Sequence, residues 1–268
     1  MSSNPEQVAE EKRFRSLRTF NIAMGFLHMV QGVLMLIVAN ESTLPLKTNF
    51  VSFNPDTLEL TTVSETLVNL RLGPFVAMFL FVSMIAHFAV SSPWAYDWYV
   101  RNLKKKINYA RWFEYSISSS IMVVVIAMLC GIYDLSTIIL LFSLNATMNL
   151  FGLMMELHNQ TTQKTNWTAF ILGCFAGLMV WVVLGVQFFG AVGLAGDFPP
   201  FVIFIFVSLA AFFNVFAINM LLQYRAKGRW KDYLFGERVY IILSLVAKSA
   251  LAWQVFSGTL MGPVSGAA

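Results

Sequence analysis

The chain has 268 residues, of which 57% are hydrophobic and only 12% are charged, and its formal net charge is +4. Soluble domains carry about 25% charged residues, so this composition excludes an ordinary water-soluble fold. A helix that spans a bilayer needs about 20 mostly apolar residues, and the chain has room for seven such helices with short loops. We therefore predict a single all-α membrane domain over residues 1–268.

The first 19 residues are polar and highly charged. Their charged side chains are Glu6, Glu10, Glu11, Lys12, Arg13, Arg15 and Arg18. A secretory signal would place an apolar stretch close to the initiator, and this segment has none. We expect residues 1–19 to be a cytoplasmic amphipathic segment that forms a short helix on the membrane surface.

Seven apolar runs follow, each long enough to cross a bilayer. They cover about residues 20–39, 73–92, 109–131, 135–157, 167–190, 201–224 and 235–260. The third run could begin earlier, near Arg101. Pro199 and Pro200 stand at the start of the sixth run, where a helix tolerates proline. The pattern predicts a bundle of seven transmembrane helices.

The loop between the first two runs, residues 41–72, is long. Its segment 57–63 alternates polar and apolar residues, as a strand does, and Asn54-Pro55-Asp56 is typical of a turn. We expect a small β-hairpin in this extracellular loop, lying on the membrane surface. A disordered loop is the alternative.

Charge in the loops predicts the orientation. Fifteen Lys/Arg residues lie on one side of the spans, and only Lys47 and Arg71 lie on the other. The fifteen are Lys12, Arg13, Arg15, Arg18, Arg101, Lys104, Lys105, Lys106, Arg111, Lys164, Arg225, Lys227, Arg229, Lys231 and Arg238. The positive-inside rule then puts the N-terminus in the cytoplasm and the C-terminus outside the cell membrane. Because orientation explains these charges, we expect contact with membrane lipid and no nucleic-acid partner.

Common catalytic and metal-binding motifs are absent from the sequence, including Walker A, GxGxxG, GxSxG, CxxC and HExxH. The two cysteines, Cys130 and Cys174, lie inside apolar runs. We expect both to be buried structural thiols and not a disulfide. An enzyme is therefore the function that the sequence supports least.

Lys248 is the one basic residue in the middle of a span, about 13 residues into the seventh run. A charge at this depth costs about 2.5–3.5 kcal/mol on insertion scales, so the amine needs a partner or a chemical modification. A buried amine can act as a nucleophile toward an aldehyde, and a Schiff base to a carbonyl cofactor is one solution. The alternative, commoner among membrane proteins in general, is a structural lysine paired with a carboxylate.

Glu114, in the third run, is the candidate partner. Ser118 and Met122 share its helix face, and Ser244 lies one turn before Lys248, within reach of the same nitrogen. Taken alone, each serine more often bonds the carbonyl of the preceding turn.

Two histidines lie at nearly the same depth as Glu114. His28 has Gln31 one turn on, and His87 has Ser83 one turn back. We expect these side chains to form one polar, water-containing cavity on the cytoplasmic side of Lys248, although each histidine alone could simply bond a neighbouring helix. Glu156, near the inner end of its run, is expected to face water.

The outer halves of the spans contain only uncharged polar groups, with Asp134 at the rim. A proton pump needs titratable groups on both sides of its switch, so this asymmetry argues against transport.

Two segments, Arg111-Trp112-Phe113-Glu114-Tyr115-Ser116-Ile117-Ser118-Ser119-Ser120 and Leu243-Ser244-Leu245-Val246-Ala247-Lys248-Ser249-Ala250-Leu251-Ala252-Trp253-Gln254, closely resemble the heliorhodopsins. The resemblance extends over nearly the whole chain, from Phe26-Leu27-His28 to the last span. Ordinary microbial rhodopsins also have a lysine in the last helix but place the N-terminus outside, so the inverted orientation fits the heliorhodopsins.

The resemblance implies that Lys248 carries all-trans retinal, covalently bound as a protonated Schiff base, with Glu114 as counterion and Ser244 beside it. His28 and His87 would line a cavity that accepts the released proton. It further implies a slow photocycle, light sensing mostly without ion transport, and a homodimer built from the outer hairpin and the fourth and fifth spans. The downstream cytoplasmic signalling partner is not identified by the sequence.

Four bulky residues at mid-membrane depth are expected to form the wall of the chromophore pocket, since thioether and aromatic groups suit a flat apolar ligand. They are Met122, Met148, Trp181 and Phe213. Each alone could equally be ordinary helix packing. Asn149 departs from the expected pattern, because an apolar residue is usual there.

Two rival functions remain at this stage. A light-driven proton or ion pump, or a channel, is the alternative function. A retinal-free scaffold, in which Lys248 and Glu114 are only an ion pair, is the other.

Overall fold

The computed structural model describes residues 5–195 and 200–260. Within these ranges the chain forms eight α-helices, one two-stranded sheet and two short irregular helices. The elements are α1 (Pro5–Val38), β1 (Thr43–Asn54), β2 (Glu59–Arg71), α2 (Leu72–Ser91), α3 (Pro93–Lys104), α4 (Tyr109–Leu129), α5 (Leu135–His158), α6 (Thr168–Ala195), α7 (Pro200–Tyr224), η1 (Gly228–Lys231), α8 (Tyr233–Val255) and η2 (Phe256–Leu260).

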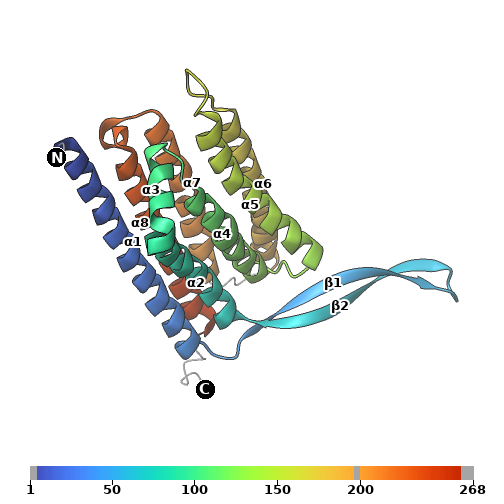
Figure 1. Ribbon diagram of the computed structural model, residues 1–268. Helices are drawn as coiled ribbons and strands as arrows, with labels where there is room; N and C mark the ends of the chain where they lie inside the picture. The colour runs from blue at the N-terminus through green and yellow to red at the C-terminus, as the bar shows by residue number, and fades with distance from the viewer. Residues whose placement is uncertain (1–4, 196–199, 261–268) are drawn as a thin grey trace.

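Seven helices are long and apolar enough to cross a membrane, and α3 is the exception. The predicted seven-helix architecture is therefore confirmed. The long helices stand side by side in one bundle (Figure 1). We call the end of the bundle that holds residue 5, α3 and η1 the N-terminal face, and the opposite end, from which the strands project, the hairpin face.

The charged start of the chain differs from the expected surface helix. Residues 5–19 are the first turns of the 34-residue helix α1, which continues without a break into the span. No helix breaker separates the polar and apolar parts, and Phe14 and Leu17 are buried against Tyr99 and Leu103 of α3. Packing against the protein thus stabilises this segment as part of α1.

The third span begins at Tyr109, so the earlier start near Arg101 is wrong. Residues around Arg101 belong to α3, which begins at Pro93, a residue suited to the first helical turn. The Asn108 side chain accepts a hydrogen bond from the Arg111 amide at 3.0 Å and caps the start of α4.

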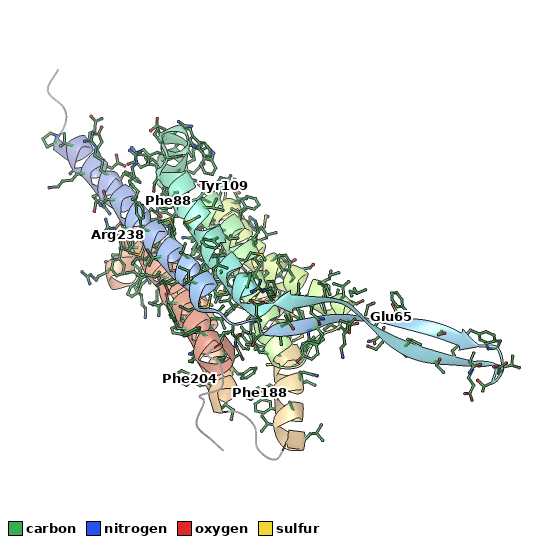
Figure 2. The ribbon with its side chains drawn as sticks, turned by 90° about the horizontal axis from the view of Figure 1, so that it is seen from below. Glu65, Phe88, Tyr109, Phe188, Phe204 and Arg238 are labelled. Carbon is green, nitrogen blue, oxygen red and sulfur yellow. The ribbon has the colours of Figure 1, made fainter. Side chains whose placement is uncertain are left out.

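The loop between α1 and α2 is a long antiparallel hairpin, and not a disordered segment. Thr43 pairs with Arg71, and Asn54 pairs with Glu59 at the tip. The Asn54 side chain accepts the Asp56 amide at 3.0 Å, as Asx turns do. The hairpin reaches far beyond the bundle, and Glu65 lies about halfway along it (Figure 2). The predicted hairpin is confirmed, and it is larger than expected.

The main hydrophobic core lies between Lys248 and the hairpin face. Residues Ile121 to Met128 of α4 are all buried, which makes α4 the central helix of the bundle. Large apolar side chains on the outside of α1, α6 and α7 are exposed, as expected where helices face lipid. Polar buried groups therefore concentrate toward the N-terminal face.

Candidate functional site

Lys248 lies in the middle of α8 with its amine buried. Its Nζ is 2.8 Å from Glu114 Oε1 and donates to Ser244 Oγ at 2.6 Å. Ser83 of α2 donates to the same Glu114 oxygen at 2.6 Å. The side chains of Lys248 and Glu114 are 3% and 8% exposed. One amine and one carboxylate thus form a hydrogen-bonded ion pair that water barely reaches.

Helix periodicity explains how these groups meet. Ser244 and Lys248 are one turn apart and share a face of α8, and α4 presents Glu114 from the opposite side. The Lys248 ammonium also lies 5.2 Å from the centre of the Tyr115 ring, within the range of a cation–π contact. In the described part of the chain, the hydrogen bonds and the ring contact of this amine therefore come from α4 and α8.

An apolar cavity begins at Lys248 and extends between α4, α5, α6, α7 and α8. Its empty volume is about 830 Å³, open side included, which is within the usual range for small-molecule pockets. Its large side chains are Trp112, Tyr115, Met122, Met148, Phe170, Phe213, Phe216, Met220 and Tyr240. An apolar molecule with a reactive aldehyde would find both an apolar lining and an amine here.

Two glycines allow the wall of the apolar cavity to pack closely. A Cβ at Gly152 would lie 2.3 Å from the Trp112 ring, and a Cβ at Gly177 would lie 2.6 Å from Met148 Sδ. Trp112 is held in place, because its Nε1 donates to Glu156 Oε2 at 2.8 Å. Close approach of the α5 backbone thus fixes the position of this ring.

Replacing Gly152 with alanine is expected to destabilise the protein by about 1–3 kcal/mol, as overpacking of a rigid core does. The added methyl group must displace Trp112, which then either loses its bond to Glu156 or enters the apolar cavity. Thermal unfolding in detergent measures the effect. Gly190→Ala is the matched control, because nothing lies within 4 Å of a Cβ there. Equal stability of the two variants would contradict the packing argument.

A second, polar cavity lies on the N-terminal side of Lys248. Glu114, His87, Ser244, Asn108 and Arg111 are among its lining residues. His87 Nδ1 is 2.8 Å from the side-chain oxygen of Asn21 on α1. The cavity thus joins the Lys248 site to polar groups deeper in the N-terminal half of the bundle.

The histidines lie together, and Gln31 lies apart from them. The rings of His28 and His87 stack with centroids 5.5 Å apart. His28 is fully buried, and neither ring nitrogen has a hydrogen-bond partner within the described residues. Gln31 instead accepts a bond from Trp253 Nε1 at 3.2 Å on an exposed part of α1. One helical turn separates Gln31 from His28, but it points away from the cavity.

Other predicted pocket residues divide into two groups. Met122, Met148 and Phe213 line the apolar cavity, whereas Trp181 packs behind Phe213 with ring centroids 5.5 Å apart. Ser118 is fully buried one turn after Glu114, and its hydroxyl has no hydrogen bond of good geometry in the described structure. Trp181 is therefore one layer removed from the wall that we expected it to form.

Asn149 adds a polar spot to the apolar cavity. Its Nδ2 donates to Ser119 Oγ at 3.0 Å and to the Asn145 carbonyl at 2.9 Å. Asn145 Nδ2 also donates to the Ser119 and Ser120 hydroxyls, at 2.8 and 3.0 Å. The unusual asparagine therefore belongs to a network that joins α4 to α5.

Sequence reasoning missed a buried cluster of Arg111, Glu156 and Glu237, which we call the Arg111 cluster. The Arg111 guanidinium forms ion pairs with both carboxylates and lies 4.0 Å from the centre of the Tyr240 ring. The expectation that Glu156 faces water is wrong, since its side chain is 1% exposed. The sequence does contain a signal for this cluster. All three residues lie within two turns of the N-terminal-face ends of their helices, so their depths match.

The cysteines are free, but only Cys130 is buried. Cys174 lines the apolar cavity and is exposed at the surface of α6, so the expectation of two buried thiols is wrong for it. An apolar run on a lipid-facing helix does not imply burial within the protein. In the described ranges, His, Cys, Asp and Glu form no group able to hold a metal ion.

Comparisons with known proteins agree with this geometry. The family model described as Heliorhodopsin matches residues 17–260. A solved structure, the transmembrane domain and linker region of Salpingoeca rosetta rhodopsin phosphodiesterase, is similar with a TM-score of 0.60 and 14% identity. That likeness covers 96% of this chain and 84% of the other, and at this identity it concerns the fold alone. No curated protein sequence matches the chain.

Proposed function

The chain belongs to the heliorhodopsin family, and from this premise we propose that it is a light sensor that binds all-trans retinal covalently through Lys248, with a slow photocycle and without ion transport. Family and fold make it a multi-pass membrane protein of the retinal-type photoreceptors. The observation that carries the proposal is the buried contact with Glu114 made by Lys248, a residue that also lines the apolar cavity.

The residues around the cavity fit retinal. The mostly apolar lining suits the polyene, and the Lys248 amine in that lining suits the aldehyde. When bound, retinal supplies a chromophore whose light-driven isomerisation starts the response. The chain's own contribution is to fix the position of the nitrogen and to exclude water from it.

Glu114 has the role of counterion in this proposal. At 2.8 Å it offsets the positive charge on the Lys248 nitrogen, which is otherwise expensive in hydrocarbon. Ser83 donates to the carboxylate and so helps to hold it in place. Ser244 accepts a hydrogen bond from the amine and limits its orientation. A change in the direction of this N–H would break the contacts of the nitrogen with Glu114 and Ser244. The polar cavity beside them could then accept the proton.

The core beyond Lys248 supports sensing over the alternative, a light-driven pump or channel. Leu251, Ala252 and Val255 of α8 are buried against the α4 core toward the hairpin face. A conducting path would need polar groups there. Absence of light-induced pH changes or photocurrents in cells is the expected result.

We also propose that the N-terminal face is cytoplasmic, because the loops on it hold most of the basic residues.

A homodimer in which the hairpin and helices α5 and α6 meet a second copy is proposed as well. The exposed apolar side chains Phe50, Val51 and Leu60 of the hairpin support this contact. The basic loops of the N-terminal face are a docking surface for an acidic signalling partner in this proposal. We propose no enzymatic activity.

Reconstitution tests the function. Purified protein mixed with all-trans retinal should develop a visible absorption band, and flash photolysis should then show a slow return to the dark spectrum. If no visible absorption band forms, the proposal is wrong.

Changing Glu114 to glutamine should move that band to longer wavelength. Excitation shifts positive charge away from the nitrogen, so a carboxylate beside the nitrogen stabilises the ground state more than the excited state. Removing the carboxylate's charge therefore narrows the gap between the two states. Glu65→Gln, at an exposed position of the hairpin outside the bundle, is the matched control (Figure 2). An unmoved band in Glu114→Gln would remove this residue from the counterion role.

A further inference from the structure

The Arg111 cluster holds more negative than positive charge. Two carboxylates, Glu156 and Glu237, share one guanidinium, and the three side chains are only 1%, 1% and 5% exposed. Buried charge without a partner is costly. One additional proton would leave the cluster neutral.

Other titratable side chains around the cluster do not remove the imbalance. They are Tyr99 on α3, Tyr115 on α4, Tyr224 on α7, and Tyr233 and Tyr240 on α8. A tyrosine is uncharged at neutral pH. The described surroundings thus supply hydrogen bonds, such as that from Tyr233 to Glu156 at 3.3 Å, but no second cation.

The polar cavity connects this cluster to Lys248. At one end it is lined by Glu114 and Ser244, and at the other by Asn108 and Arg111. Asn108 Nδ2 donates to Glu237 Oε2 at 2.6 Å, so the far wall of the cavity contacts the carboxylate directly. The buried Arg111 Nε has no hydrogen-bond partner in the part of the chain that the structure describes, which leaves a donor for a molecule in the cavity.

Helix geometry sets the length of the path. Glu237, Ser244 and Lys248 are spaced so that they share one face of α8. Eleven residues separate the first from the last, about 16 Å along the axis at 1.5 Å per residue. On α4, Arg111 precedes Glu114 by less than one turn. Two polar stripes therefore face each other across the cavity.

We propose that Glu156 and Glu237 form a second proton site, which takes the proton that leaves the Lys248 nitrogen after illumination. The inference rests on the proposed function and names the internal destination of the proton. The N–H bond at Lys248 breaks, the nitrogen keeps the electron pair, and an O–H bond forms on one of the two carboxylates. Glu114 stays ionised. The proton returns by the same cavity, so none crosses the membrane.

Infrared difference spectroscopy on the retinal-loaded protein tests the site. The light-minus-dark spectrum of the wild type should gain a carbonyl band of a protonated carboxylic acid. Glu156→Gln and Glu237→Gln each leave a balanced Arg–Glu pair, so the band should be lost. Loss in at least one of these variants supports the site. A band that persists in both assigns the proton to Glu114 or elsewhere and overturns the inference. Glu65→Gln is the control that should keep the band.

A second measurement needs no retinal. Acid-minus-neutral infrared spectra of the retinal-free protein should contain a carbonyl contribution that is missing from the Glu237→Gln or Glu156→Gln spectrum. It should therefore remain when either variant spectrum is subtracted from that of the wild type, and be larger than the difference left by Glu65→Gln. Equal spectra for all variants would overturn the site. If the wild type forms no visible band, the proposed function fails, while this titration still tests the proton site separately.

Discussion

Protein with Lys248 changed to alanine will form no red-shifted visible band when it is mixed with all-trans retinal. Lys248 supplies the amine in the lining of the apolar cavity, 2.8 Å from Glu114, and without it no covalent link can form there. Absorption should remain that of free retinal, whereas Lys105→Ala, at an exposed position of the N-terminal face, should form the wild-type band. A wild-type band in Lys248→Ala would show that Lys248 is not the residue that binds retinal covalently.

Misfolding must be separated from the loss of the link. Lys248→Ala leaves the Glu114 carboxylate buried without its cation, which is itself costly. The double variant Lys248→Ala/Glu114→Gln removes both charges and should unfold near the wild-type temperature, still without a band. Retinal already condensed with a small alkylamine should restore a band in Lys248→Ala, because the cavity and Glu114 remain.

The span pattern was readable from the sequence because hydrocarbon imposes a simple rule. Each span must be apolar for about 20 residues, and seven runs met that rule. α3 was harder to separate from α4, because Lys105 to Asn108 interrupt the helix without a strong sequence signal other than the Asn108 cap. The continuation of α1 to Pro5 was missed because its stability depends on packing against α3.

Depth along a helix was enough to bring Lys248, Glu114, His28 and His87 to one region. Depth cannot give rotation about the helix axis, and rotation is what separates Gln31 from His28. The same limit applies to Trp181, which has the right depth but lies behind Phe213. The rotation of a helix about its axis is fixed by the helices that pack against it. The sequence of a single helix does not say which helices these are.

The Arg111 cluster was missed for a different reason. Arg111 and Glu156 lie near helix ends, where water or snorkelling usually satisfies a charge. Only the side-by-side placement of α4, α5 and α8 shows that the three charged groups meet each other and not solvent. Because Arg111 was counted among the loop charges that set the orientation, its buried ion pairs with Glu156 and Glu237 were not predicted.

Changing Arg111 to glutamine should be the most destabilising single substitution at the N-terminal face. It leaves Glu156 and Glu237 buried side by side without a cation, and breaking a buried pair by removing one partner costs about 3–5 kcal/mol. The contacts of the guanidinium with the Tyr240 and Trp112 rings are lost as well. Thermal unfolding of the retinal-free protein in detergent measures the loss, with Arg101→Gln, exposed on α3, as the control.

The charge argument also predicts the rescue. Adding Glu156→Gln and Glu237→Gln to Arg111→Gln replaces three buried charges by neutral amides and should recover much of the lost stability. The effect should reach the chromophore, because Glu156 holds Trp112 Nε1 at 2.8 Å and Trp112 lines the apolar cavity. Arg111→Gln should therefore also weaken retinal binding, although it lies outside that cavity. If Arg111→Gln unfolds at the same temperature as the wild type, the two carboxylates are already neutral in the dark. The proton site proposed for them would then be occupied before illumination.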